Sequence, residues 1–190
     1  MDIIAADICK AFGDNKVLNG FSHVFGEGSV TAVVGPSGCG KSTLLSVLMG
    51  TLPPDSGSVT RPERLSAVFQ ENRLCENLTV SANIRLVTGK RYSRAEIAAE
   101  LAEIGLAGCE NKAVRELSGG MKRRAALLRA LLADHDALFL DEPFKGLDEE
   151  TKQSVMEYCK SKIRGKTVIL VTHDRGECDF LADETIELSY

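Results

Sequence analysis

The sequence contains no tryptophan, and its three tyrosines and seven phenylalanines make aromatic residues only 5% of its 190 positions. Single-stranded nucleic acids are bound by stacking on aromatic side chains, so this composition argues against that function. The net charge of −4 provides no overall attraction for a phosphate backbone either. We therefore expect no nucleic-acid partner.

The six cysteines contain no Cys-x-x-Cys pair, and only three histidines are present. A zinc site and a disulfide framework are therefore poor interpretations, and we expect reduced thiols that are mostly small buried groups. Long hydrophobic runs are also absent: the longest, such as 137–140 and 168–171, are too short to cross a bilayer. The first residues lack the basic and apolar segments of a signal peptide. We expect a cytoplasmic protein in which residues 1–190 form one domain.

Buried strands alternate with helices along the chain. Strands are predicted at 29–34, 65–69, 137–140, 166–171 and 185–188, and helices at 41–49, 93–104, 148–163 and 175–181. This alternation predicts an α/β fold with a mostly parallel sheet covered by helices. The first 28 residues read as short antiparallel strands separated by glycine turns, and helical signals dominate an inserted subdomain of about 71–133.

A glycine-rich segment links the strand 29–34 to the helix 41–49. Residues 35–42, Gly-Pro-Ser-Gly-Cys-Gly-Lys-Ser, fit the phosphate-binding pattern G-x-x-x-x-G-K-[ST]. The glycines let backbone N–H groups turn toward phosphate oxygens, Lys41 reaches the β- and γ-phosphates, and Ser42 places a hydroxyl on Mg²⁺. The alternative is a glycine-rich turn that precedes a lysine by chance. The candidate nucleotide-binding residues are Gly35, Pro36, Ser37, Gly38, Cys39, Gly40, Lys41, Ser42 and Thr43.

Two adjacent carboxylates follow the strand 137–140. Asp141 stands where the Mg²⁺-orienting carboxylate of a P-loop protein is expected, and Glu142 is placed to accept a proton from an attacking water. The alternative is an acidic turn before Pro143. Together with Gly35, Gln70 and His173, which also follow predicted strands, they indicate a ligand site at the carboxyl edge of the sheet.

A third segment, Leu117-Ser118-Gly119-Gly120-Met121, precedes the apolar helix that carries Leu127–Leu132. A serine and two glycines at a helix start can form an anion-binding nest, although an ordinary helix cap has the same appearance. With this segment in place, the order of motifs resembles the ATP-binding subunit of ABC transporters over essentially the whole chain. The matching segments are the P-loop ending in Lys41-Ser42, Gln70, Leu117–Gly120, Leu138–Pro143, Gly146–Asp148 and Thr172–Asp174.

The resemblance implies roles that spacing alone does not. Members form head-to-tail dimers that hold two ATP molecules, so Ser118, Gly119 and Gly120 would bind the γ-phosphate of the opposite subunit. Gln70 would approach Mg²⁺ and the attacking water, and His173 would contact the γ-phosphate. The aromatic residue before Gly13, Phe12, would stack on adenine, although from the residues alone it is more simply a core side chain.

Some positions depart from the family pattern. Met121 stands where the signature usually has glutamine, and Lys145 replaces a usually small residue. The basic run 122–124 is expected to be a solvated helix face rather than a nucleic-acid patch. The 29 positions from Lys41 to Gln70 are short for the family and resemble the importers of nitrate, sulfonate and taurine.

The resemblance also implies cofactors and partners. The cofactors would be ATP and Mg²⁺, and the partners a second ATP-binding subunit (a copy or a paralogue), a transmembrane permease and a solute-binding protein. The favoured function is ATP hydrolysis that powers import from the inner face of the membrane. The alternatives are a non-transport ABC-type ATPase and a nucleotide-dependent binding module with little turnover, and intact Glu142 and His173 argue against the last.

Overall fold

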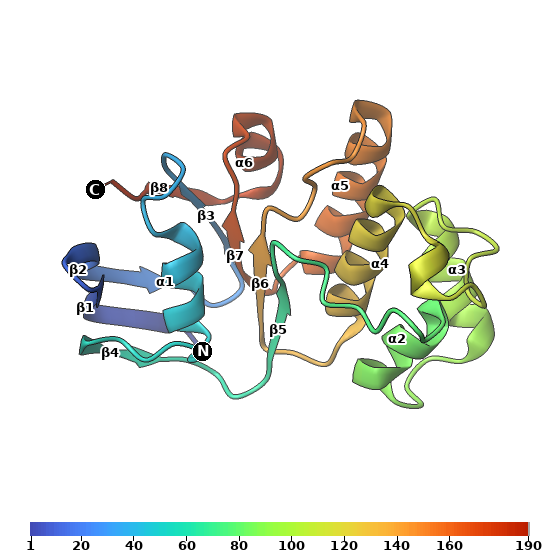
Figure 1. The fold of residues 1–190 in the computed structure, drawn as a ribbon, viewed down its shortest axis with the longest axis horizontal. Helices are drawn as coiled ribbons and strands as arrows, with labels where there is room; N and C mark the ends of the chain where they lie inside the picture. The colour runs from blue at the N-terminus through green and yellow to red at the C-terminus, as the bar shows by residue number, and fades with distance from the viewer. Residues whose placement is uncertain (190) are drawn as a thin grey trace. The chain divides into compact units, whose positions relative to one another are not determined.

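The structure is a computed structural model that describes residues 1–189, and the chain divides into two compact units. The first unit comprises residues 1–65, 136–141 and those from 165 onward. The second comprises 66–135 and 142–164. Both units are drawn in Figure 1.

The first unit holds the sheets. Its elements are β1 (Ile3–Phe12), β2 (Asn15–Phe25), β3 (Val30–Val34), α1 (Lys41–Leu48), β4 (Ser56–Thr60), β6 (Ala137–Asp141), β7 (Thr167–Val171), α6 (Arg175–Leu181) and β8 (Glu184–Glu187). One sheet has the order β2-β1-β4, with antiparallel pairing, and the other has the order β5-β6-β7-β3-β8. In the second sheet β3 pairs in parallel with β7 and β8, and β6 with β7. The predicted α/β fold with a parallel sheet and an antiparallel β subdomain is confirmed.

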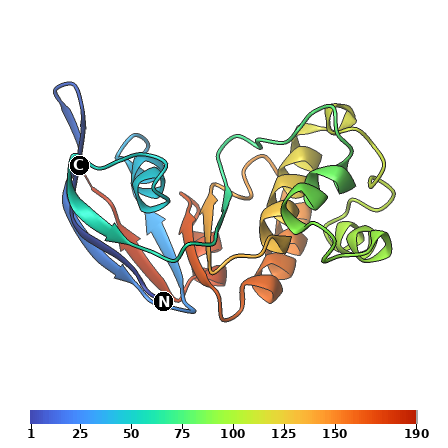
Figure 2. The ribbon, with the colours of Figure 1, turned by 90° about the horizontal axis from the view of Figure 1, so that it is seen from below.

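The antiparallel part is built on a long hairpin of β1 and β2, which Figure 2 shows as a curved ribbon. Phe12 pairs with Asn15 across a two-residue turn, and Gly13 in that turn has a φ of 60°. Two-residue hairpin turns require positive φ, which explains why glycine stands there. The strand β4 was not predicted, because its sequence Ser-Gly-Ser-Val-Thr has no apolar alternation.

The parallel strands form the core of the first unit. Every residue of β6 and β7 is buried, as are the first four of β3. Strands buried on both faces read as continuous apolar runs, which is why the sequence located all three. The helix α1 contacts both β6 and β7.

The second unit is mainly helical. Its elements are α2 (Val80–Thr88), α3 (Arg94–Glu103), the 3₁₀ turn η1 (Val114–Glu116), α4 (Gly119–Leu132) and α5 (Glu149–Ile163), and β5 (Leu65–Val68) crosses the boundary between the units. Within this unit α4 contacts α2, α3 and α5, and both views show α4 and α5 side by side. No helix within residues 1–189 is long and apolar enough to cross a membrane.

Within residues 1–189, five α-helices are preceded by an N-cap residue whose side chain accepts a backbone N–H. These residues are Thr79, Ser93, Ser118, Asp148 and Asp174. At Ser93 the predicted capping box is complete, because Glu96 also accepts the Ser93 N–H. Such caps satisfy N–H groups that have no partner inside the helix. The remaining helix, α1, starts differently.

Candidate functional site

The carboxyl ends of three parallel strands lie side by side in the first unit. Val33 near the end of β3 pairs with Val171 at the end of β7, and Val171 pairs with Asp141 at the end of β6. The loops that leave this edge begin at Gly35, Glu142 and Thr172. The structure therefore brings the glycine-rich loop, Asp141 and the His173 segment to one edge of the sheet.

The helix α1 begins at Gly40, which is left-handed (φ 103°) and offers no side-chain cap. No acidic side chain lies in its first turn either. The N–H groups of a first turn have no partner within the helix, and the helix dipole adds positive potential there. A phosphate group supplies the oxygens and negative charge that such an N-terminus lacks.

The glycines of the loop are required by space as well as by backbone angle. A Cβ on Gly35, whose φ is 149°, would lie 2.2 Å from the Leu188 carbonyl oxygen. A Cβ on Gly40 would lie 2.6 Å from Val17 Cγ1. Real Cβ atoms do not approach so closely, so any side chain at either position would deform the loop.

Lys41 folds back over the same loop. Its Nζ donates hydrogen bonds of 2.8 Å to the carbonyl oxygens of Gly35 and Pro36. Cys39 is buried, with its Sγ 3.9 Å from Nζ, whereas Ser42 is exposed at the helix start. The loop thus places the Lys41 ammonium and the Ser42 hydroxyl beside the uncapped N–H groups of α1. A nucleotide phosphate and its Mg²⁺ need these groups.

Asp141 and His173 differ in exposure. Asp141 is 7% exposed at the end of β6, whereas His173 is exposed just beyond β7. Phe12, at the end of β1, is 53% exposed, and the Lys10 ammonium lies 5.8 Å from the centre of its ring. The simpler interpretation of Phe12 as a core residue is wrong, because about half of this residue's surface is exposed to solvent.

Gln70 and Glu142 lie in the second unit. Gln70 is exposed two residues beyond β5, and Glu142 is partly buried. Glu142 has a left-handed backbone with a φ of 51°, which is uncommon for a residue with a side chain. Such a conformation persists only where neighbouring contacts impose it. One such contact at Glu142 is a hydrogen bond that its carbonyl oxygen accepts from the Arg123 guanidinium group.

The serine-glycine segment starts α4. Ser118 Oγ accepts the Met121 N–H at 3.3 Å, so this serine is a helix cap. A Cβ on Gly119 would meet nothing within 4 Å, and one on Gly120 would lie 3.5 Å from Leu147 Cδ2. The surroundings of Gly119 therefore leave room for an approaching group.

The basic run 122–124 is not the solvated face that the sequence suggested. Arg123 is only 4% exposed, and Lys122 pairs with Glu76 at 3.0 Å. Arg124 donates to the carbonyl oxygens of Ile104 and Gly105 at the end of α3. The expectation is wrong because Arg123 lies on the buried face of α4, where its charge is matched by hydrogen bonds to carbonyl oxygens. Its spacing was the available signal, because Arg123 lies one turn before Leu127.

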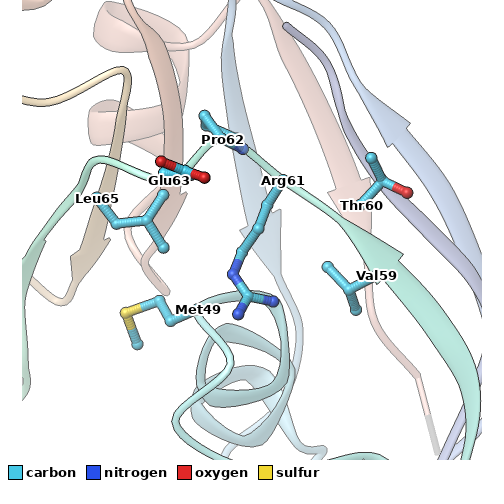
Figure 3. Close-up of a pocket in the computed structure, with 7 residues that line it drawn as sticks. All are labelled: Met49, Val59, Thr60, Arg61, Pro62, Glu63 and Leu65. Atoms are coloured by element: carbon cyan, nitrogen blue, oxygen red, sulfur yellow. The ribbon is translucent and has the colours of Figure 1, made fainter.

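A separate pocket of about 590 Å³ lies in the first unit beside the C-terminal end of α1 (Figure 3). It is lined by Met49, Val59, Thr60, Arg61, Pro62, Glu63 and Leu65. None of these was predicted as a site residue.

Comparison with known proteins agrees with this geometry. The family model described as "ABC transporter" matches residues 18–145. The chain is 37% identical to the aliphatic sulfonates import ATP-binding protein SsuB 1 of Pseudomonas aeruginosa, over 95% of this chain and 79% of that protein. It is 41% identical to SsuB 3 of Paraburkholderia xenovorans, over 93% and 72%.

A solved structure is similar as well. The ATP-binding cassette MJ0796, a dimer in a post-hydrolysis state bound to ADP and Pi, superposes with a TM-score of 0.88 at 26% identity, covering 98% of this chain and 94% of that one. The sheet and its glycine-rich loop define a nucleotide-binding α/β protein. The chain belongs to the ABC transporter family, and its predicted class, an ATP-binding and ATP-hydrolysing subunit, is confirmed.

Proposed function

We propose that this chain powers an importer whose cargo is a small organic anion of the sulfonate class. Its relatives in Pseudomonas and Paraburkholderia are import proteins for aliphatic sulfonates. The short interval between Lys41 and Gln70 independently resembles that group. The observation that carries the nucleotide part of the proposal is the uncapped α1 N-terminus behind a glycine-rich loop.

In this proposal the amides of the segment 35–43 cradle the phosphates, Lys41 neutralises the β- and γ-phosphates, and Phe12 stacks on adenine. Ser42, Gln70 and Asp141 would hold Mg²⁺, and their oxygen atoms suit this hard cation. When bound, the ion would neutralise charge on the phosphate oxygens.

Glu142 and His173 would act on the hydrolytic step. Glu142 would accept a proton from water as the water oxygen bonds to the γ-phosphorus and the bond to the β–γ bridging oxygen breaks. His173 would donate a hydrogen bond to a γ-phosphate oxygen as charge builds on it. The products are ADP and inorganic phosphate.

The remaining partners follow from the same proposal. Two copies, or this chain and a paralogue, would meet head to tail, with Ser118, Gly119 and Gly120 of one against the nucleotide of the other. A transmembrane permease would dock from the membrane at the surface near 71–74 and 78–84, where Leu78 is 39% exposed, and a solute-binding protein would deliver the cargo. The chain would then work at the inner face of the membrane. Its site would have no role for nucleic acid.

Nucleotide binding is tested with Lys41→Ala. Removing the ammonium leaves phosphate charge unneutralised, so ATP affinity should fall by about 1.5–3 kcal/mol, or about 10- to 100-fold. The measurement is titration with a fluorescent ATP analogue, and Lys16→Ala, an exposed lysine on β2, is the control. Unchanged affinity in Lys41→Ala would refute the phosphate cradle.

Hydrolysis is tested with Glu142→Gln, because the amide cannot accept the proton. We expect the variant to bind ATP, to form a stable dimer and to lose turnover by about 10²-fold or more. Phosphate release and size-exclusion chromatography measure these properties, with Glu150→Gln, an exposed acid on α5, as control. Turnover equal to that of the parent would rule out Glu142 as the general base.

Co-purification with a permease distinguishes a transporter subunit from a non-transport ATPase.

A further inference from the structure

Arg123 joins two loops of the second unit through one buried guanidinium group. Its Nη1 donates to the Phe69 carbonyl oxygen at 2.6 Å and its Nε to the Pro143 carbonyl oxygen at 3.0 Å. The loop after β5 carries Gln70, and the loop after β6 carries Glu142. Both side chains belong to the proposed hydrolytic site, and neither loop is part of a regular element there.

The contacts with each loop are multiple. On the Gln70 side, Nη1 also lies 3.4 Å from the Gln70 carbonyl oxygen and 3.3 Å from Asn72 Oδ1. On the other side, Nη2 donates to the carbonyl oxygen of Glu142 itself. A planar guanidinium directs its N–H groups along fixed, diverging lines, so one side chain sets the distance between the two loops.

The burial of Arg123 makes these bonds strong and their loss costly. The residue is 4% exposed, so its charge is solvated by these carbonyl and amide oxygens in place of water. The Glu142 backbone needs such support, because its φ of 51° is unfavourable for a residue with a side chain. Pro143 next to it cannot donate a hydrogen bond of its own.

A second arginine of the same helix reinforces one loop only. Arg129 Nη1 donates to the Arg73 carbonyl oxygen at 2.9 Å, and its Nη2 lies 3.5 Å from that of Asn72. The segment from Phe69 to Arg73 is therefore attached to α4 at both ends. Arg123 differs from Arg129 in that it also contacts the Glu142 loop.

We infer that Arg123 is a positioning residue for ATP hydrolysis, which fixes Gln70 and Glu142 relative to each other through their backbones. This inference rests on the proposed roles of these two side chains. Arg123 lies in the first turns of α4, the helix whose N-cap, Ser118, is the proposed γ-phosphate contact. Arg123 itself would touch neither nucleotide nor water, so its loss should change turnover and leave nucleotide affinity unchanged.

The test is Arg123→Lys in the full chain. Lysine keeps the charge, but its compact ammonium cannot span both loops. We expect kcat to fall by about 10- to 100-fold, as for a small misplacement of reacting groups. KM and the affinity for a fluorescent ATP analogue should stay within about threefold of the parent values. The matched control is Arg91→Lys, because Arg91 also donates to a backbone carbonyl, that of Leu132, and lies in neither loop.

Two further experiments separate a positioning role of Arg123 from an effect on protein stability alone. Arg123→Lys combined with Gln70→Ala should lose less than the product of the separate losses in kcat, because both changes disable the same arrangement. In Arg123→Ala, added guanidinium ion well below denaturing concentration should raise kcat without changing KM. If Arg123→Lys does not fold, Arg123→Gln gives the same comparison, since its amide donates to one loop only.

These experiments separate the positioning role of Arg123 from the proposed catalytic role of Glu142. If Glu142→Gln loses turnover while folded Arg123→Lys or Arg123→Gln keeps the parent kcat, the inference alone is overturned. A lower unfolding midpoint with parent kcat per folded molecule would overturn it in the same way. If Glu142→Gln hydrolyses ATP like the parent, the proposed catalytic roles fail, and the positioning role of Arg123 fails with them.

Discussion

The hydroxyl of Thr172 donates a 2.6 Å hydrogen bond to the carboxylate of Glu177, and both side chains are buried. The same hydroxyl oxygen accepts the Asp174 N–H at 3.1 Å. Thr172 therefore anchors the chain on both sides of His173, first to α6 and then to the backbone that follows. The exposed histidine is therefore held beside a buried hydrogen bond between Thr172 and Glu177, a pairing that the sequence alone did not predict.

We predict that Thr172→Val lowers the free energy of unfolding by about 1–3 kcal/mol, because the Glu177 carboxylate loses a buried donor. Valine keeps the shape, so the loss reports the hydrogen bond. ATP turnover should also fall, since His173 is no longer fixed. Urea denaturation and phosphate release measure the two effects. Asp179→Ala, an exposed change on the same helix, is the control, and a Thr172→Val variant as stable and active as the parent would contradict the prediction.

The sequence predicted those parts of the fold whose signals are local. The strands β3, β6 and β7 are apolar runs, and the capping box of Ser93 and Glu96 indicates the start of α3. β4 was missed because it pairs with β1 through its backbone while four of its five residues are exposed. Its place depends on a partner far away in the sequence, and no local pattern records that.

The site divides in the same way. The glycine-rich loop and Asp141 were predicted because their chemistry depends on residue types at short spacing, and the register at Val171 brings their strand ends together. The role of Arg123 was missed because this side chain acts by contacting backbone groups of other segments, and that of Thr172 because its hydrogen bond to Glu177 forms only when α6 packs beside the end of β7. Only the folded chain shows that Arg123 reaches Phe69 and Pro143 together.

The loop glycines give a steric prediction. Gly40→Ala places a Cβ 2.6 Å from Val17 Cγ1 on a backbone with a φ of 103°, so it should destabilise the chain by about 1–3 kcal/mol and weaken ATP binding. Gly13→Ala is the matched control: its φ is also positive, at 60°, but nothing lies within 4 Å of the added atom. Thermal unfolding with and without ATP measures both variants. Equal losses would show that backbone strain, and not the contact with Val17, limits this position.

The cysteines should differ sharply in reactivity. Burial raises the pKa of the Cys159 thiol to about 12, whereas Cys75 is exposed. Since the thiolate is the nucleophile, iodoacetamide at pH 8 should label Cys75 first and leave Cys159 unmodified in the folded chain. Peptide mass spectrometry over time measures this order, and labelling in denaturant, where all six thiols should react, is the control. Early labelling of Cys159 would mean that the second unit opens far more readily than its packing implies.

Asp148 gives a pH prediction. The Thr151 N–H, which donates to this carboxylate at 2.9 Å, holds the pKa of Asp148 below its ordinary value in the folded chain. A lowered folded-state pKa means that the unfolded chain binds the proton more readily. The carboxylate therefore stabilises the fold above the unfolded pKa of about 4, and this contribution is lost as the pH falls through the folded pKa. Asp148→Ala should unfold at lower urea concentration than the parent at pH 7, with a gap that narrows below pH of about 4. Urea unfolding at a series of pH values measures the gap. A constant gap would show that the side chain stabilises α5 independently of its charge.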